Sequence, residues 1–248
     1  MNTADPAPID YNYHYRKFHA ETDAHYARLV KHYSRLFGDL YPTIDRGLPI
    51  LDVGCGTGHF VHALRELGFG QVVGIDASRE QIAVAVKRAL PVEQIDDAAH
   101  WLARNAGRMG AIFALDLIEH IPAADQIAFL RAARTALCPG GRFVCTVPNA
   151  NAAFASRMRY IDWTHRMSFT EISLDFLLHA AGFADIRISG AEYRPRLPLL
   201  IRPSVVIWLG RGAFRLLRRI ELGLEFSFQE ARRVPLANNL KAYCMAPR

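Results

Sequence analysis

The 248-residue sequence predicts an α/β protein in which a mostly parallel sheet carries helices on both faces. Short apolar, β-branched segments alternate with helix-length segments rich in Ala, Leu, Arg and Glu, which is the pattern of strand–helix–strand units. The first strand also leads into a glycine-rich turn and a helix, a connection typical of open α/β sheets. With 51% apolar and 22% charged residues, a disordered tail protein, a collagen-like repeat and a disulfide-stapled miniprotein are excluded.

The alternation predicts seven strands and the helices between them. The strands are expected at Pro49–Val53, Gln71–Asp76, Val92–Ile95, Ala111–Asp116, Gly141–Val147, Phe183–Gly190 and Leu240–Ala246. The helices between the first five strands are expected near His59–Leu67, Arg79–Leu90, Ala98–Asn105 and Ala124–Leu137. The Pro and Gly residues of Cys138–Gly141 should end the fourth helix and turn the chain into the fifth strand. Thr170 is a suitable N-cap for a later helix that ends at Gly182.

Two further segments accompany this core. The expected boundaries are 1–47 for an N-terminal helical cap, 48–194 and 236–248 for the sheet domain, and 195–235 for a basic amphipathic helical insertion. The cap is rich in Tyr, His and Arg and shows a helical apolar pattern from Tyr26 to Phe37. We expect it either to pack on the sheet or to place Tyr13, His14, Tyr15 or Arg16 over a ligand.

The glycine-rich turn carries the strongest chemical signal. The buried strand Ile50–Val53 contains Asp52 and leads into Gly54-Cys55-Gly56-Thr57-Gly58. Glycine permits positive φ and close approach of the backbone to a ligand, and the free N–H groups of the next helix attract a carboxylate or phosphate. Eighteen residues beyond Gly58 the second strand ends at Asp76, where an acid can accept both hydroxyls of a ribose. For Gly58 itself, tight helix packing is an equally good explanation.

This combination resembles the class I S-adenosylmethionine (SAM)-dependent methyltransferases, over about residues 48–183 and the last strand. The spacing differs from the G-x-G-x-x-G fingerprint, which argues against NAD or FAD. The resemblance implies a Rossmann-like, seven-stranded sheet with an antiparallel last strand, and SAM as the cofactor. The cofactor-binding residues that it implies are Asp52, Gly54, Cys55, Gly56, Asp76, Ala77, Asp97, Ala98 and Asp116. Asp97 and Ala98 would contact adenine, although the register with Asp96 fits equally well.

A second cluster follows the fourth strand, where Asp116-Leu117-Ile118-Glu119-His120 brings two acids and a histidine together. It is similar to the E-x-x-E-H motif of ubiquinone-biosynthesis O-methyltransferases and of small-RNA ribose 2′-O-methyltransferases, with the shorter Asp116 in the first position. A later His165 completes the expected catalytic set of His120, His165 and Glu119. One interpretation is a divalent cation, Mg²⁺ or another, bound by Asp116, Glu119, His120 and His165. The others are metal-free catalysis with His120 or His165 as the base, or purely structural histidines.

The acceptor is expected to meet a segment rich in Arg, Tyr, Trp and His. The candidate substrate residues are Tyr160, Asp162, Trp163 and Arg166, with loop packing as the alternative for each. The stretch Asp162–Thr170 and the basic insertion resemble methyltransferases of surface-polysaccharide and lipopolysaccharide synthesis. That resemblance implies methyl transfer to a sugar hydroxyl of a glycan or glycolipid. Alternatives are a quinone-precursor or small-molecule O-methyltransferase, an RNA ribose 2′-O-methyltransferase and a SAM-binding pseudo-methyltransferase.

Charge is unevenly distributed along the chain, whose net charge is +6. From Arg187 onward 11 Arg and one Lys face four Glu, so this quarter carries +8 and the rest −2. An anionic partner near the C-terminus is therefore expected. The net charge of −2 on the rest of the chain argues against an extensive contact with nucleic acid.

In the insertion, an apolar helical face and an arginine face are expected on opposite sides. The apolar residues are Val205, Val206, Leu209, Ala213, Leu216, Leu217 and Ile220, and the basic ones are Arg211, Arg215, Arg218 and Arg219. Such a helix binds a membrane surface, here through residues 199–220, or packs on the domain or in a homodimer. Gly210 and Gly212 weaken the helix and favour a break.

The expected location is cytoplasmic, with a peripheral position at the inner face of the membrane as an alternative. Met1–Asp10 has no apolar core and is not a signal peptide, and no apolar run is long enough to span a bilayer. The four cysteines form no C-x-x-C pair, which agrees with a reducing compartment.

Overall fold

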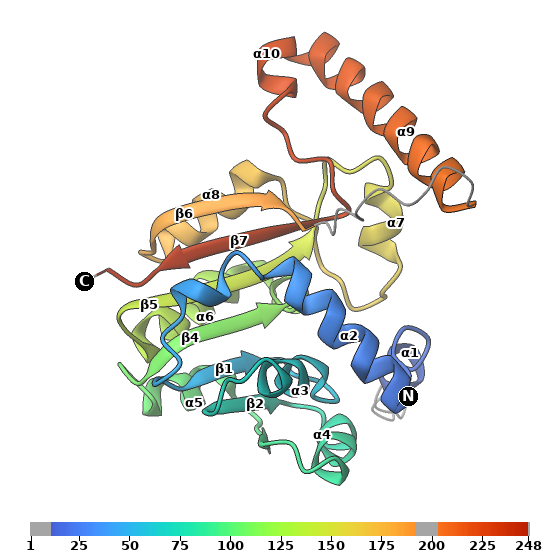
Figure 1. Cartoon of the computed structure of the whole chain (residues 1–248). Helices are drawn as coiled ribbons and strands as arrows, with labels where there is room; N and C mark the ends of the chain where they lie inside the picture. The colour runs from blue at the N-terminus through green and yellow to red at the C-terminus, as the bar shows by residue number, and fades with distance from the viewer. Residues whose placement is uncertain (1–10, 192–202, 248) are drawn as a thin grey trace, which may run out of the picture.

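The computed structural model describes residues 11–191 and 203–247 and shows the α/β fold that the sequence predicts. Seven strands form one sheet in the order β3-β2-β1-β4-β5-β7-β6, and only β7 runs antiparallel to its neighbours (Figure 1). The strands are β1 Ile50–Val53, β2 Val72–Asp76, β3 Val92–Gln94, β4 Met109–Leu115, β5 Leu137–Pro148, β6 Ala184–Gly190 and β7 Asn239–Met245. The order reverses between β1 and β4, so a crevice opens there at the carboxyl ends of the parallel strands.

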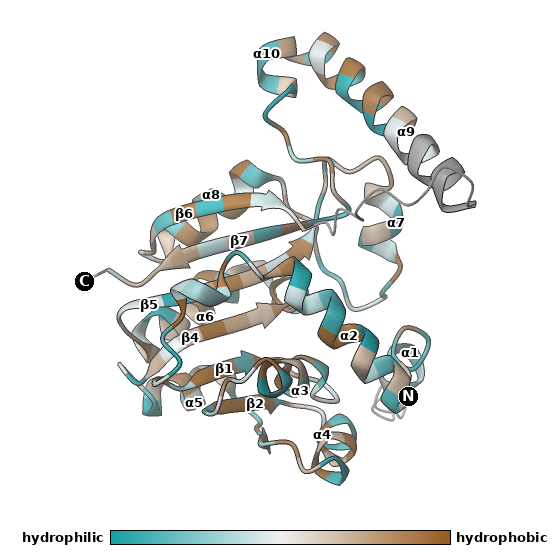
Figure 2. Cartoon of the chain, viewed as in Figure 1, coloured by the Kyte–Doolittle hydropathy of each residue, from teal (hydrophilic) through white to brown (hydrophobic). Residues whose placement is uncertain are grey.

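Helices cover both faces of the sheet. They are α3 His59–Glu66, α4 Arg79–Lys87, α5 Ala98–Arg104, α6 Ala123–Ala136 and α8 Glu171–Ala180. On one face, Leu102, Leu130 and Leu178 bring α5, α6 and α8 into a core cluster with the central strands. On the other face, Phe60 of α3 and Ile82 of α4 belong to a second cluster. The central strands lie between these clusters and are largely apolar, as Figure 2 shows in brown.

The N-terminal cap packs on the second face. It comprises α1 Tyr11–Tyr15, α2 Asp23–Leu36 and the 3₁₀ turn η1 Tyr41–Thr43. The side chain of Thr22 accepts a hydrogen bond from the His25 amide and so caps α2. Phe37 is fully buried and meets Phe60 and Phe113 edge-on, at ring-centroid distances of 5.6 and 5.7 Å. Packing therefore explains α2, whereas α1 lies over the site described below.

Most boundaries agree with the prediction to within two residues, and two differ by more. Strand β5 begins at Leu137 rather than Gly141, because Leu137 pairs with Met109 before a register shift, and Gly140 in this irregular stretch has φ +77°. Helix α4 ends at Lys87 rather than Leu90, and Ala89 adopts a left-handed φ of +52° just beyond it. Local backbone conformation at single residues, which composition does not reveal, sets both ends.

The insertion forms α9 Pro203–Glu225 and α10 Phe228–Ala231. The expected break at Gly210 and Gly212 is wrong: α9 is continuous, since two glycines weaken a helix without ending it. The two ends of the excursion meet at the sheet. The Ala191 amide donates to the Asn239 carbonyl, and the buried Asn149 side chain donates to the carbonyls of Pro235 and Ala237, at 2.9 and 2.7 Å.

Candidate active site

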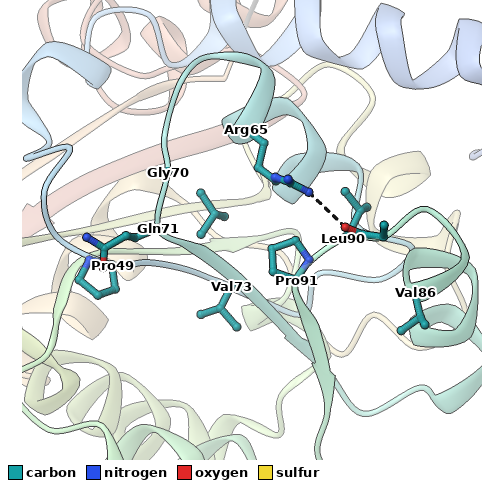
Figure 3. Close-up of a pocket in the computed structure, with 10 residues that line it drawn as sticks. Pro49, Arg65, Gly70, Gln71, Val73, Val86, Leu90 and Pro91 are labelled. Atoms are coloured by element: carbon teal, nitrogen blue, oxygen red, sulfur yellow. Dashed lines mark hydrogen bonds between the residues drawn. The ribbon is translucent and has the colours of Figure 1, made fainter.

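Two cavities of similar volume lie at opposite ends of the strands of the sheet. One, of about 630 Å³, lies at the amino ends of β1 to β3, and mostly apolar residues line it together with Arg65 and Gln71 (Figure 3). The other, of about 610 Å³, lies at the carboxyl ends of β1, β2 and β4 and contains Asp52, Asp76 and Glu119. Since ligands of open α/β sheets bind at the carboxyl ends of the strands, the second cavity is the candidate site.

The glycine loop forms one wall of this cavity with its backbone. Gly54 and Gly56 have φ of +75° and +55°, which glycine adopts without strain. A Cβ on Gly56 would lie 2.8 Å from Gln81 Oε1 and 2.9 Å from the Tyr15 hydroxyl, so a larger residue would displace both side chains in addition to straining the backbone. Gly58 packs differently, because its Cβ would meet Leu90 Cδ1 of the α4–β3 connection at 2.6 Å. Its role in tight packing therefore has a structural basis.

Two carboxylates support the loop. Asp76, at the end of β2, accepts the Gly56 amide with Oδ2 at 2.8 Å and the Ser78 amide with Oδ1 at 2.7 Å. Asp52 in β1 is 2% exposed, and its burial, together with the neighbouring Asp76, raises its pKa to about 8. A buried acid with this pKa lacks a cation, and the ammonium group of SAM would supply one. The cradle thus fits the amino-acid end and ribose of SAM.

The other implied cofactor residues are divided. Cys55, Ala77 and Asp116 line the cavity with Asp52, Gly54, Gly56 and Asp76. Asp97 and Ala98 are not among its lining residues, and Asp97 instead caps α5 by accepting the His100 amide at 3.1 Å. Their contact with adenine stays a prediction.

Asp116 follows β4 in a strained conformation, with φ of +49°. Thr146 of β5 accepts the Asp116 amide and donates its hydroxyl to Asp116 Oδ1, both at 3.0 Å. Asn239, the first residue of β7, donates to the same oxygen at 2.9 Å. Three strands therefore fix this carboxylate at the mouth of the cavity.

A hydrogen-bond chain determines the tautomer of His120, which ends the 3₁₀ turn η2 Ile118–His120. The Thr164 hydroxyl lies 2.7 Å from Asp162 Oδ1 and 2.8 Å from His120 Nδ1. A carboxylate only accepts, so Thr164 gives its single proton to Asp162 and must accept from His120 Nδ1–H. The lone pair of His120 is then on Nε2. Burial and the nearby His165 lower its pKa to about 4, so the ring is neutral at pH 7.

His165 has the same tautomer for a similar reason. Its Nδ1 lies 3.0 Å from the Met158 carbonyl, which only accepts, so Nδ1 carries the proton. Its Nε2 is 3.9 Å from Glu119 Oε1, and the His120 and His165 rings are 4.8 Å apart. Glu119 is fully buried, and neither carboxylate oxygen has a hydrogen-bond partner among the described residues. Burial and Asp116 raise its pKa well above the usual value.

These three residues form a set of potential metal ligands, with one atom of each lying within 4.8 Å of the others. Both rings donate through Nδ1 to a fixed acceptor, which is how metal-binding histidines are usually oriented. A buried carboxylate without a partner is stabilised by a cation. The residues therefore fit a divalent cation, with Asp116 outside the set that the structure brings together.

The expected acceptor residues do not all reach the cavity. Asp162 is buried and lines it, with its Oδ2 3.2 Å from His14 Nε2 of the cap. Tyr160 and Trp163 are 75% and 88% exposed and do not line it. Arg166 is exposed and donates to the His120 carbonyl at 3.0 Å, so it connects its own segment to the turn η2.

Sequence reasoning missed Thr164, Thr146 and Asn239. Short polar side chains of this kind are common in loops, and only the sheet order reveals that β5 and β7 flank Asp116. The sequence offered the alternative that the N-terminal cap places side chains over a ligand. His14 and Tyr15 of the cap do line the cavity, whereas Tyr13 is 66% exposed.

The sheet order, the glycine loop and the acids at the ends of β1 and β2 are those of the class I SAM-dependent methyltransferases. The chain belongs to the methyltransferase-domain family, whose model matches residues 20–188. The chain therefore contains a SAM-dependent methyltransferase domain.

Curated relatives carry the name ubiquinone biosynthesis O-methyltransferase. One from Xanthomonas axonopodis pv. citri is 31% identical over 187 residues, covering 71% of this chain and 73% of the relative. Another, from Cereibacter sphaeroides, is 31% identical over 164 residues, covering 60% of this chain. The match spans 65% of that relative's length. These relatives are not named for polysaccharide synthesis.

Solved structures share the fold at low sequence identity. A SAM-dependent methyltransferase from Archaeoglobus fulgidus superposes with a TM-score of 0.65 and 18% identity, over 96% of this chain and all of that one. Phosphoethanolamine N-methyltransferase 2 of Haemonchus contortus, in complex with SAM, superposes with a TM-score of 0.53 and 19% identity. The match covers 88% of this chain and 57% of that protein.

Proposed function

We propose that the protein transfers the methyl group of SAM to a phenolic hydroxyl of a quinone precursor or a related small molecule. One observation carries this proposal: His120 and His165 adjoin the buried Glu119 in the cavity that the glycine loop lines, with His165 Nε2 3.9 Å from Glu119 Oε1. The names of the curated relatives support the acceptor class.

The reaction needs alignment of the acceptor and removal of one proton. The acceptor oxygen attacks the methyl carbon of SAM in line with the bond to sulfur, so that an O–C bond forms while the S–C bond breaks. His120 Nε2 takes the hydroxyl proton. The resulting imidazolium is stabilised through Nδ1–H, Thr164 and the Asp162 carboxylate.

The basicity of His120 favours a phenol over a sugar hydroxyl. Its pKa of about 4 makes it a weak base, and such a base assists best when the acceptor is itself acidic. A phenol ionises near pH 10, as tyrosine does, whereas a sugar hydroxyl is a much weaker acid. Apolar side chains at this end of the cavity, among them Leu117, Met158 and Ile161, suit an aromatic ring.

A divalent cation fits the same residues. Glu119, His120 and His165 would bind it, and when bound it would acidify the acceptor hydroxyl and neutralise the buried carboxylate. His120 would then be a ligand, and proton removal would fall to solvent or to the nearby Asp116.

The test is transfer of labelled methyl from SAM to a panel of catechols and quinone precursors, nucleotide sugars and glycans, and RNA. Each acceptor is assayed after chelation, with and without added Mg²⁺. We expect label on the phenolic acceptors, and loss of transfer in His120→Gln with SAM binding retained. Label only on sugars or only on RNA would overturn the proposal. Full turnover after chelation would show that the reaction needs no divalent cation.

We also propose that α9 and α10 contact an anionic lipid surface. Leu217, which belongs to the apolar face expected from the sequence, and Leu224 point outward and are 63% and 76% exposed. Arg218 turns inward, where it pairs with Glu221 at 2.7 Å and reaches the Asn151 carbonyl. Exposed apolar side chains within a quarter of the chain that carries +8 are typical of interfacial helices. None of the described helices has an apolar stretch long enough to cross a bilayer.

A further inference from the structure

A second group of histidines lies where the N-terminal cap meets α3, and two of them, His19 and His59, also line the candidate cavity beside the glycine loop. His19 follows α1, His25 lies in the first turn of α2, and His59 is the first residue of α3. Their ring centroids are 5.1 to 5.8 Å apart. One ring nitrogen of each lies within 4.8 Å of the others, so three separate segments converge on one point.

One ring nitrogen of each histidine makes no hydrogen bond to the described residues. His25 and His59 are 6% and 4% exposed, and the Nε2 atom of each is buried without a hydrogen bond in the described part of the chain. His19 Nδ1 is buried in the same way. A buried polar atom without a partner destabilises a fold by roughly 1–3 kcal/mol, and three that converge indicate a shared ligand.

We propose that His19, His25 and His59 bind a first-row divalent transition metal, with zinc the best match to three imidazoles. Zinc–nitrogen bonds of about 2.0–2.1 Å place tetrahedral ligand atoms roughly 3.3 Å apart, so small rotations of the rings from the present separations complete the site. Water takes the fourth position. The proposal is independent of the acceptor.

The surroundings of His59 suit this role. Its Nδ1 lies 3.1 Å from the Thr57 hydroxyl and 3.3 Å from the Tyr15 hydroxyl, so Nδ1–H has an acceptor when Nε2 holds the metal. Burial also lowers the pKa of His59 to about 3 and of His19 to about 4, which keeps both rings neutral at pH 7. Neutral imidazole is the form that binds metal.

Arg28 opposes metal binding at His25. Its Nη2 lies 2.6 Å from His25 Nδ1, and because a guanidinium only donates, the neutral ring must carry its proton on Nε2. Metal binding therefore requires the exposed Arg28 side chain to turn away and Nδ1 to take the proton. Replacing Arg28 by Gln, whose carbonyl accepts from Nδ1–H, should strengthen binding.

The metal site would join the N-terminal cap to the glycine loop. His59 directly follows Gly58, and Thr57 contacts Tyr15 of α1 through its side chain and Tyr26 of α2 through its carbonyl. A metal at this point would hold α1, which covers the cavity, at a fixed distance from the loop.

The experiment uses the full chain with His120→Asn, which removes a ligand of the other metal-binding set. The stripped protein is equilibrated with zinc, and bound metal is counted by mass spectrometry. We expect one zinc per chain, and a rise in Tm when zinc is added. His25→Asn and His59→Asn should weaken the affinity by about 100-fold or more, beyond the effect of losing a supporting partner. His62→Asn, a control one turn further along α3, should bind zinc normally.

Equal zinc content in the His25→Asn and parent proteins, or weaker binding by Arg28→Gln, would overturn the site. If His25→Asn does not fold, Co²⁺ bound to the parent decides the question. The visible bands of a four-coordinate, nitrogen-bound ion support the proposal, and their absence refutes it.

Discussion

Thr164 has one hydroxyl proton and two neighbours that compete for it, Asp162 and His120. The carboxylate must receive it, and this choice places the lone pair of His120 toward the acceptor. Thr164→Val keeps the shape of the side chain and removes the link. We expect kcat to fall by about 10–100-fold while the Kd for SAM stays unchanged, measured by methyl transfer and calorimetry.

Thr164→Ser is the matched control, since it keeps the hydroxyl and should retain most activity. Equal losses of activity in both variants would show that Thr164 matters only for packing.

Asp52 predicts a pH dependence of SAM binding. Its pKa of about 8 means that the free protein holds a proton there at pH 7, whereas the ammonium of SAM favours the carboxylate. Binding below pH 8 therefore releases a proton, and affinity rises with pH by up to about tenfold per unit. Above that, affinity falls because an α-amino group loses its own proton near pH 8. Calorimetry in buffers of different ionisation enthalpy measures the proton released.

Asp52→Asn should bind SAM more weakly and without the rising limb. A wild-type affinity for SAM that stays constant over about two pH units below the raised pKa would show that Asp52 is not protonated in the free protein.

The site residues that the sequence predicted are those whose position follows from the ends of strands. Asp52, Asp76 and Asp116 lie at or just beyond the carboxyl ends of parallel strands, so they come together on one side of the sheet. Trp163 shows the limit: its neighbours in sequence, Asp162 and Thr164, belong to the site, while its own side chain points to solvent. The direction of a loop side chain depends on packing that no local pattern encodes.

At the scale of elements, two glycines should respond oppositely to alanine. Gly58→Ala meets both an unfavourable φ of +78° and Leu90 at 2.6 Å, so we expect a loss of about 2–4 kcal/mol in unfolding free energy. Gly210→Ala lies within α9 with open space around the new Cβ, and should gain roughly 0.5–1 kcal/mol. Thermal and denaturant unfolding measure both.

Gly107→Ala separates the two causes at Gly58, because it has φ of +69° and no atom within 4 Å. A loss at Gly107 as large as that at Gly58 would assign the whole effect to the backbone.

The elements were largely predictable, but the orientation of α9 was not. Strand and helix positions follow from residue periodicity, which is a property of the local sequence. The two sides of an amphipathic helix are also readable, yet which side faces the domain is a tertiary choice. Here Leu222 is buried while Leu216 and Leu217 are exposed, and Arg219 reaches the Ala231 carbonyl.

For the whole molecule, the outward apolar face predicts lipid binding. Leu217→Glu with Leu224→Glu should abolish co-flotation with phosphatidylcholine–phosphatidylglycerol vesicles, because each buried leucine contributes roughly 1.5–3 kcal/mol to binding, so that loss of the pair lowers the affinity about 100-fold or more. Binding of the wild type should weaken with salt.

Ile172→Glu with Phe176→Glu is the matched control, since both residues are similarly exposed on α8. Wild-type protein that does not float would contradict lipid binding. A wild-type dimer in sedimentation that the α9 variant dissociates would assign this face to a second copy instead.

The path of the chain through the insertion has a consequence for modularity. The excursion leaves the sheet after Gly190 and returns at Asn239, and Gly190 pairs directly with Leu240. With Asn149 holding the returning segment, the two ends are neighbours whatever lies between them. The insertion is therefore an exchangeable unit: a short hairpin turn, or a helix from another protein, can replace it while β6 and β7 stay paired. Exchange of the insertion would leave the sheet, and the site at the carboxyl ends of its strands, in place.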